Sequence, residues 1–232
     1  MPTLKPALSS FSDPQAVARY SEGPARQVPG FHAVQQMALL LLAESVPSDG
    51  RVLVLGAGGG LELKVFAEAQ PGWRFVGVDP SAEMLKLADA TLGNLASRVD
   101  LREGYVDTAP EGPFDGATCL LTLHFLDAVE RLHTLKELRR RLRPGAPLVV
   151  AHHSFPQGAD EKTRWLGRYA AFAVSSGIPA SSARSAIDAI GSRLPVLSPE
   201  ADAALLREAG FDRIELFYAG FTFKGWVAYG AS

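Results

Sequence analysis

The chain has 232 residues, of which 47% are hydrophobic, with 23 basic and 25 acidic side chains. This hydrophobic content is sufficient for one large core. Because the charges nearly cancel, the composition excludes a bulk field that would recruit nucleic acid or an anionic membrane surface, and it favours a small-molecule substrate.

The single cysteine, Cys119, excludes an internal disulfide and a cysteine metal cluster and favours a reducing compartment. No stretch approaches the roughly 18 apolar residues of a membrane-spanning helix, and the first residues lack the apolar segment of a signal peptide. We therefore expect a soluble, cytoplasmic protein without a membrane anchor or a direct nucleic-acid partner.

Two helices are predicted before the first strand. Asp13 and Pro14 form an N-cap and first-turn pair that begins a short helix ending near Gly23. A second helix begins at Phe31, after the Val-Pro-Gly turn at residues 28–30. We expect residues 1–49 to cover a cleft within one domain that spans residues 1–232.

A glycine-rich turn follows the first predicted strand. Residues 52–55 are apolar without alternation, as in a parallel strand buried on both faces, and glycines follow at positions 56, 58, 59 and 60. Helical periodicity resumes at Leu61, so the glycines lie at a strand-to-helix junction, where doubly wound sheets bind nucleotides. A structural turn without a nucleotide is the alternative.

The kind of nucleotide follows from two further residues. Asp79 ends the second predicted strand, residues 74–78, and lies 23 residues after Gly56, where a carboxylate can accept both hydroxyls of a ribose. The dinucleotide fingerprint G-x-G-x-x-G would need glycine at position 61, which is leucine. The chain also lacks the Y-x-x-x-K pair of short-chain dehydrogenases, so a dehydrogenase is disfavoured.

The remaining strands complete a sheet. Strands are predicted at residues 99–106, 114–125 and 147–151, with an amphipathic helix after Asp127. The basic run at residues 139–141 complements the helix dipole, although a nucleic-acid patch is the alternative. Two closing strands at 213–223 and 225–229 are joined too closely for a parallel crossover, so they must pair antiparallel.

Residues 152–195 interrupt the alternation of strands and helices with two helices, predicted at 160–176 and 181–192. Such a long insertion is typical of an active-site lid. Trp165, Tyr169 and Phe172 share one face of the first helix. They are candidates either for core packing or for a cation–π lid over a sulfonium or a cationic amine substrate.

Three histidines are placed near the carboxyl ends of the fourth and fifth strands. His124 and His153 are candidates for a general base, and His152 for a substrate contact. Adjacent strand residues face opposite ways, so only one of His152 and His153 is expected to face the cleft. The alternative is hydrogen bonding to loops. Their spacing does not predict a metal site.

Five strand–helix units, the G-x-G-x-G turn and the antiparallel closing pair resemble the class I S-adenosylmethionine-dependent methyltransferases. The resemblance implies an α/β fold, a three-layer, doubly wound, seven-stranded Rossmann-like sheet with a helical lid. It also implies S-adenosyl-L-methionine as cofactor and S-adenosyl-L-homocysteine as product. The predicted cofactor contacts are Phe31, Gly56, Ala57, Gly58, Asp79, Pro80, Met84, Tyr105, Val106 and Leu121.

A narrower resemblance covers three segments, VPGFHAVQQMALLLLAE, TLHFL and LREAGFDRIELFYAGFTFKGWVAYG. They are similar to the carboxy-S-adenosylmethionine synthases that serve tRNA wobble-uridine modification. Two departures matter. Tyr105 stands where that family has an aspartate at the adenine position, with Asp107 two residues later. Ile187 stands where the family has the arginine that holds the transferred carboxylate, and Arg184 and Arg193 are out of register.

The leading hypothesis is therefore methyl transfer to a small-molecule acceptor by an S-adenosylmethionine-dependent methyltransferase, because a carboxylated donor would lack its counter-charge. A carboxy-S-adenosylmethionine synthase-like enzyme is the first alternative. A non-catalytic nucleotide-binding module is the second, because fold alone does not establish chemistry. A homodimer is the candidate assembly.

Overall fold

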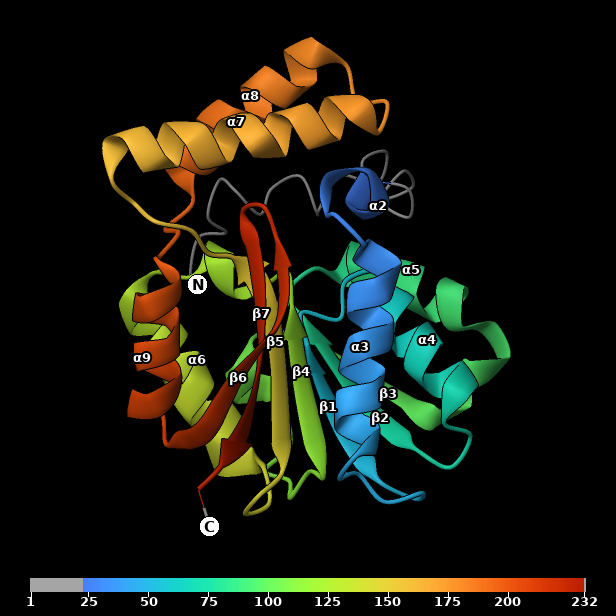
Figure 1. Ribbon diagram of the computed structural model, residues 1–232. Coiled ribbons are helices and arrows are strands. Elements are labelled where there is room, and N and C mark those ends of the chain that lie inside the picture. The colour runs from blue at the N-terminus through green and yellow to red at the C-terminus, as the bar shows by residue number, and fades with distance from the viewer. Residues whose placement is uncertain (1–22, 232) are drawn as a thin grey trace.

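The computed structural model describes residues 23–231 and shows a seven-stranded sheet between two layers of helices (Figure 1). The strand order is β3-β2-β1-β4-β5-β7-β6, and β7 runs antiparallel to both of its neighbours. The helix predicted from Asp13 lies outside the described residues. The strands are β1 Arg51–Leu55, β2 Arg74–Asp79, β3 Val99–Glu103, β4 Gly116–Leu120, β5 Pro147–His153, β6 Phe211–Gly220 and β7 Phe223–Gly230.

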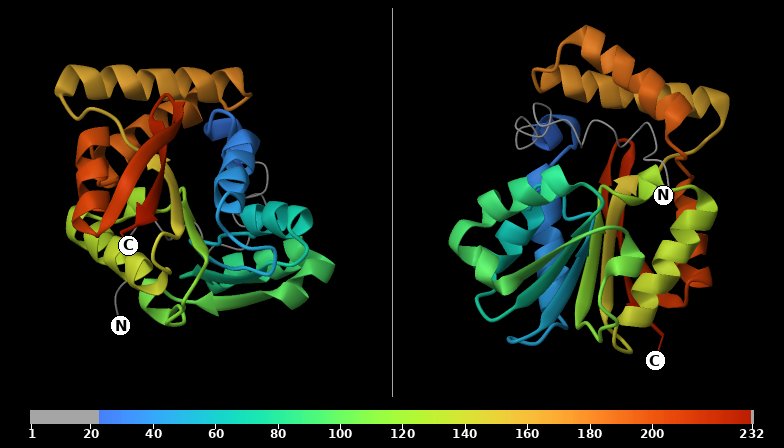
Figure 2. Two further views of the ribbon diagram at one scale, coloured as in Figure 1. Left: turned by 60° about the horizontal axis from the view of Figure 1, so that its bottom comes forward. Right: turned by 180° about the vertical axis from the view of Figure 1, so that it is seen from behind.

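Helices cover both faces of this sheet, as the views from two further sides show (Figure 2). α3, α4 and α5 lie on one face, and α6 and α9 lie on the other. This arrangement confirms the predicted doubly wound fold with a terminal antiparallel pair. The helices are α2 Gly23–Gln27, α3 Phe31–Ala43, α4 Leu61–Ala69, α5 Ala82–Leu92, α6 Ala128–Arg141, α7 Ala159–Ser175, α8 Ala180–Arg193 and α9 Pro199–Glu208, with 3₁₀ turns at Gly93–Arg98, Val106–Thr108 and Leu123–Phe125.

The apolar run of β1 divides between two cores. Leu53 and Leu55 belong to the core under α6 and α9, whereas Val52 and Val54 belong to the core under α3 and α4. All four side chains are buried. Burial on both faces explains why this strand shows no alternation of apolar and polar residues.

α7 and α8 form a helical pair above the carboxyl edge of the parallel strands (Figure 1). A third hydrophobic cluster joins the pair to the rest of the chain through Val28, Phe31, Phe155, Tyr169 and Phe223. The predicted lid insertion thus packs on the segment before α3 and on the start of β7.

Several strand boundaries differ from the prediction. The closing pair turns at Phe221 and Thr222 rather than at residue 224, because β6 ends at Gly220 and β7 begins at Phe223. β3 ends at Glu103, the last residue that pairs with β2, and Gly104 then turns the chain with φ 140°. β4 ends at Leu120 because Leu121 adopts a left-handed conformation, with φ 57°. β5 extends through His152 to His153, both of which pair with β7.

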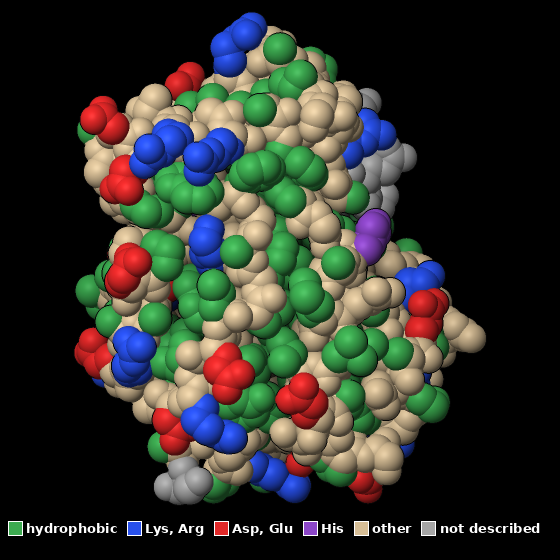
Figure 3. Space-filling view, viewed as in Figure 1, with side chains coloured by type: hydrophobic (Ala, Val, Ile, Leu, Met, Phe, Trp, Pro, Cys, Tyr) green, Lys and Arg blue, Asp and Glu red, His purple; other side chains and the backbone are tan. Residues whose placement is uncertain are grey.

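The face that presents α3, β6 and β7 carries hydrophobic and uncharged side chains at its centre, with acidic and basic side chains interspersed around them (Figure 3). Leu40 and Leu216 are exposed hydrophobic residues on α3 and β6. No single sign of charge dominates this face. The expected homodimer stays a prediction.

Candidate active site

A pocket opens at the carboxyl edge of β1, β2 and β4, beneath the start of α3. Residues that follow each of these strands form its walls, and α3 closes one side. The lining includes Phe31, Gln35, Gly56, Ala57, Gly59, Glu62, Asp79, Pro80, Met84, Tyr105, Val106, Leu121, Thr122, Phe125, Leu126 and Tyr218. Nine of the ten predicted cofactor contacts are among its lining residues. The tenth, Gly58, lies in the same turn.

Two glycines of this turn are required for different reasons. Gly56 has φ 78°, and a Cβ there would lie 1.9 Å from Oγ1 of Thr122 on the opposite pocket wall. Gly60 also has φ 78°, but its Cβ would meet Ala88 of α5, at 2.9 Å from Cα. Gly56 therefore shapes the pocket, whereas Gly60 allows α5 to approach the turn.

Asp79 connects the end of β2 to the glycine turn. Its Oδ2 accepts a hydrogen bond from the amide of Gly58, and its Oδ1 accepts one from the amide of Ser81, each at 2.9 Å. Burial raises the pKa of Asp79, and the two amides oppose that rise. The carboxylate is thus fixed at the pocket wall and retains lone pairs that can accept hydroxyl groups.

Glu62 is a second carboxylate in the pocket wall, and the sequence analysis did not identify it. It lies in the first turn of α4, is 8% exposed, and accepts a hydrogen bond of 2.6 Å from Oγ1 of Thr118. Burial raises its pKa to about 8. The signal was present in the sequence, because Glu62 precedes Phe66 by four residues and so shares its face of the helix.

The inward face of α4 includes Glu62 together with apolar residues. Leu63, Phe66 and Ala67 are buried together with Glu62, whereas Leu61 and Val65 are only partly buried. Gln35 of α3, which is also buried in the pocket wall, was likewise not identified from the sequence.

The pocket wall has an asymmetric charge. Glu62 and Asp79 line it, and no lysine, arginine or histidine does so among the described residues. Because a cation beside a buried carboxyl group favours its ionised form, this wall suits a ligand with positive charge better than one with an added carboxylate.

The outer end of the pocket is apolar. Phe31 begins α3 after Gly30, and the hydroxyl of Tyr218 donates a 2.6 Å hydrogen bond to the carbonyl of Pro29. β6 thereby fixes the turn that presents Phe31. Leu121 and Phe125 face the same pocket from the segment after β4.

The predicted adenine wall is formed after β3. Tyr105 is 41% exposed and Val106 is buried at the start of a 3₁₀ turn. Asp107 points elsewhere, since its carboxylate lies 3.2 Å from Nε2 of His133 at the surface. The pocket thus contains Tyr105 and Val106 but not Asp107.

The three histidines do not line the pocket, contrary to the prediction of a cleft position. His124 and His153 pack together with ring centroids 4.9 Å apart, and burial lowers the pKa of both, that of His153 to about 3. His152 lies on the other face of β5, with Nε2 3.3 Å from Oδ1 of Asp202. Because β5 extends to His153, both His152 and His153 lie within the sheet. Their burial away from the pocket argues against a role as general base.

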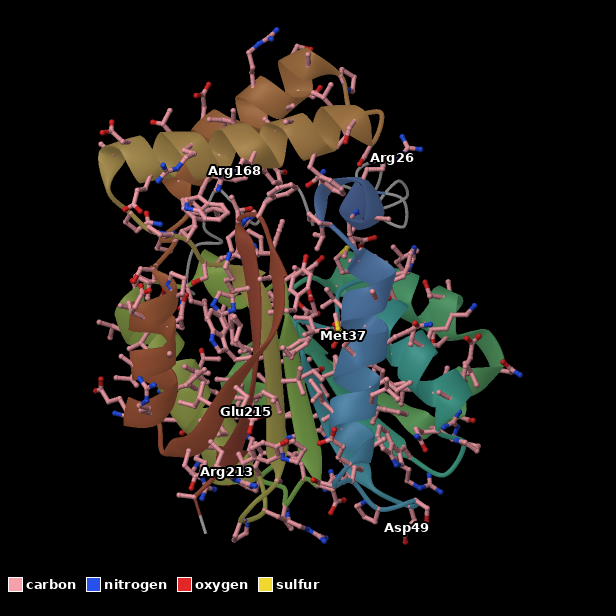
Figure 4. The ribbon with its side chains drawn as sticks, viewed as in Figure 1. Arg26, Met37, Asp49, Arg168, Arg213 and Glu215 are labelled. Atoms are coloured by element: carbon pink, nitrogen blue, oxygen red, sulfur yellow. The ribbon has the colours of Figure 1, made fainter. Side chains whose placement is uncertain are left out.

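The aromatic residues of α7 also lie outside the pocket wall. Trp165 stacks with two cations of this chain, Arg168 at 4.6 Å and Lys224 at 4.9 Å; Arg168 lies on α7 (Figure 4). Tyr169 packs on Phe223, and Phe172 packs on Phe221. The structure therefore favours the packing alternative for all three over direct contact with a ligand.

Within residues 23–231, no helix is both long and apolar enough to cross a membrane. The same part of the chain contains no group of three or more histidine, cysteine, aspartate or glutamate side chains arranged to hold a metal ion.

Comparisons with known proteins agree with this geometry. Residues 53–148 match a family model described as a methyltransferase domain. The carboxy-S-adenosyl-L-methionine synthase of Chromohalobacter salexigens is 28% identical over 96% of this chain and 84% of its own length. The trans-aconitate 2-methyltransferase of Azoarcus sp. is 35% identical over 55% of this chain and 48% of its own.

Solved structures show the same fold. Human N-acetylserotonin methyltransferase, solved in complex with S-adenosylmethionine, aligns with a TM-score of 0.64 at 15% identity. The alignment covers 100% of this chain, which spans 61% of the human chain. This chain is therefore about three fifths as long as the solved chain it matches.

Fold and pocket together define a nucleoside-binding α/β protein of the methyltransferase type. The sequence matches show a methyltransferase domain over residues 53–148 and make the chain similar to the class I S-adenosylmethionine-dependent methyltransferases. S-adenosylmethionine is the cofactor of this class.

Proposed function

We propose that this protein transfers the methyl group of S-adenosylmethionine to an apolar small-molecule acceptor. The observation that carries the proposal is the charge of the pocket wall, which contains Glu62 and Asp79 and no basic side chain among the described residues. S-adenosylmethionine carries a sulfonium, an ammonium and one carboxylate group, so its net charge is positive and fits this wall. The apolar lining around Phe31, Leu121 and Phe125 supports an apolar acceptor.

The residues of the pocket act mainly by positioning. S-adenosylmethionine supplies an electrophilic methyl group on a positively charged sulfur. The glycine turn and Asp79 hold the nucleoside, and the apolar outer end orients the acceptor and excludes water. Alignment of this kind is worth roughly 7–11 kcal/mol in favourable cases, so a catalytic base is not required.

A carboxy-S-adenosylmethionine synthase-like activity is the second candidate, because relatives named as such synthases match most of the chain. A carboxylated donor would place an anion in the pocket. Ile187 lies in α8, away from the pocket lining, and no basic residue replaces it there among residues 23–231. This observation favours plain methyl transfer.

Isotope transfer can separate the two candidates. Purified protein should be incubated with methyl-labelled S-adenosylmethionine and with metabolite fractions sorted by polarity. We expect label in a product from the apolar fractions, and S-adenosylhomocysteine as the second product. Accumulation of a carboxylated donor, detected by mass spectrometry of the nucleosides, would instead support the synthase.

Asp79→Ala should weaken S-adenosylhomocysteine binding at least tenfold. The variant loses charge-assisted hydrogen bonds to ribose hydroxyls, each worth roughly 1.5–3 kcal/mol. Asp79→Asn should lose less, since its side-chain oxygen still accepts one bond. Asp107→Ala is the matched control and should leave affinity unchanged, because its carboxylate faces His133. Calorimetric titration measures all three, and equal affinity in wild type and Asp79→Ala would exclude the ribose role.

A further inference from the structure

The turn before α3 presents a residue of the pocket wall. Residues 28–30 lead the chain from α2 into α3, and Gly30 adopts a left-handed conformation, with φ 66°, and provides no side-chain cap. Phe31 is the first residue of α3 and lines the pocket. Because the first amides of a helix have no partner within the helix, the position of this segment depends on contacts from other elements.

Tyr218 supplies such a contact from β6, the edge strand of the sheet (Figure 1). Its hydroxyl donates the 2.6 Å hydrogen bond to the carbonyl of Pro29. Burial raises the pKa of Tyr218 to about 12, so the hydroxyl keeps the proton that it donates. Its ring packs against the core under α3 and α4 and also against the hydrophobic cluster that joins the lid to the rest of the chain. Tyr218 therefore connects the turn to both.

Gly220, the last residue of β6, makes room for this contact. A Cβ at that position would lie 2.2 Å from the hydroxyl oxygen of Tyr218 and 3.2 Å from Cβ of Pro29. Only a residue without a side chain lets the tyrosine and the turn approach each other here. Two residues of one strand thus determine where the turn lies, and with it how Phe31 enters the pocket.

We infer that Tyr218 is a positioning residue for the methyl donor, which acts by holding Phe31 in the pocket wall. This inference rests on the proposed function and on the predicted contact of Phe31 with S-adenosylmethionine. Without the bond to Pro29, the turn can leave the arrangement that presents Phe31. The apparent affinity for the donor then falls with the population of that arrangement.

Tyr218→Phe removes the hydroxyl and keeps the ring. We expect it to lower the affinity for S-adenosylhomocysteine roughly three- to tenfold in calorimetric titration, the effect of one neutral hydrogen bond. In a Phe31→Leu background, the same substitution should change the affinity less than about twofold, because the residue through which it acts is already altered. A purely structural role would lower the melting temperature in both backgrounds without this difference in affinity.

Gly220→Ala tests the same contact by another route. The added methyl group displaces the hydroxyl of Tyr218 from Pro29 without removing it, so this variant should lower the affinity as Tyr218→Phe does. Tyr229→Phe is the matched control, because it removes the hydroxyl of a buried tyrosine in β7 that does not line the pocket. It should bind S-adenosylhomocysteine as wild type does.

Three outcomes are informative. A loss of affinity in Tyr218→Phe that disappears in the Phe31→Leu background supports the inference. Unchanged affinity in Tyr218→Phe, or an equal loss in both backgrounds, overturns it while leaving donor binding by the wild type intact. If the wild type does not bind S-adenosylhomocysteine, the proposed function fails, and the inference fails with it.

Discussion

Asp202→Ala is expected to lower the free energy of unfolding by about 3–5 kcal/mol, the usual cost of removing one partner of a buried ion pair. Asp202 and Arg131 are 2% and 0% exposed and form a direct ion pair between α9 and α6. Although burial opposes ionisation, His152 and Arg131 hold the pKa of Asp202 below its ordinary value. Without Asp202, the guanidinium remains buried and without its counter-charge.

The loss of stability in Asp202→Ala should also affect the attachment of the lid, α7 and α8. Arg131 also donates to the carbonyls of Leu126, in the pocket wall, and Pro195, just after α8, at 3.2 and 3.0 Å. Denaturant unfolding followed by circular dichroism measures the loss. Asp212→Ala is the control, because its ion pair with Arg213 is exposed and spans 3.8 Å, and it should cost no more than about 0.5 kcal/mol. If Asp202→Ala also lowered the free energy of unfolding by no more than about 0.5 kcal/mol, the buried ion pair would not stabilise the fold as expected.

Glu62→Gln is expected to stabilise the ligand-free protein at alkaline pH. The folded-state pKa of Glu62 is about 8, above its ordinary value of 4.5. A raised pKa contributes stability that is fully present below pH 4.5 and is lost as pH rises through 8. At about 1.4 kcal/mol for each pKa unit, the wild type should lose about 5 kcal/mol that the variant keeps.

Thermal unfolding at several pH values measures this difference. The two proteins should unfold at similar temperatures near pH 5, and the variant should gain about 10 °C near pH 8.5. Asp79 titrates in both proteins, and burial keeps the thiol of Cys119 neutral, so neither contributes to the difference. Melting temperatures that differ equally at both pH values would contradict the assignment.

The sequence was sufficient to predict the sheet. Residues 52–55 are uniformly apolar because both faces of β1 are buried. The short connection between the closing strands permits only antiparallel pairing, although it lies at Phe221 and Thr222 and not at residue 224. Asp79 and the glycine turn were expected at the carboxyl edge of the sheet, and they lie there because their positions depend on local spacing.

Residues whose position depends on tertiary packing could not be located in this way. The left-handed Leu121 ends β4 early, and nothing local in a leucine predicts that conformation. His152 and His153 were expected at an open strand end, but pairing with β7 extends β5 past both. Glu62 shares its helix with the exposed charges Lys64 and Glu68, and only its position four residues before the buried Phe66 distinguishes it from them in the sequence.

Calorimetric titration of the wild-type protein with S-adenosylhomocysteine, and separately with NAD, tests the central claim most directly. The pocket wall contains two carboxylates, Glu62 and Asp79, the second at the proposed ribose position, and no described basic side chain. Leu61 replaces the third glycine of the dinucleotide fingerprint. The account predicts saturable binding of S-adenosylhomocysteine at micromolar concentration and none of NAD. No heat with S-adenosylhomocysteine at high micromolar concentration, together with saturable binding of NAD, would contradict it.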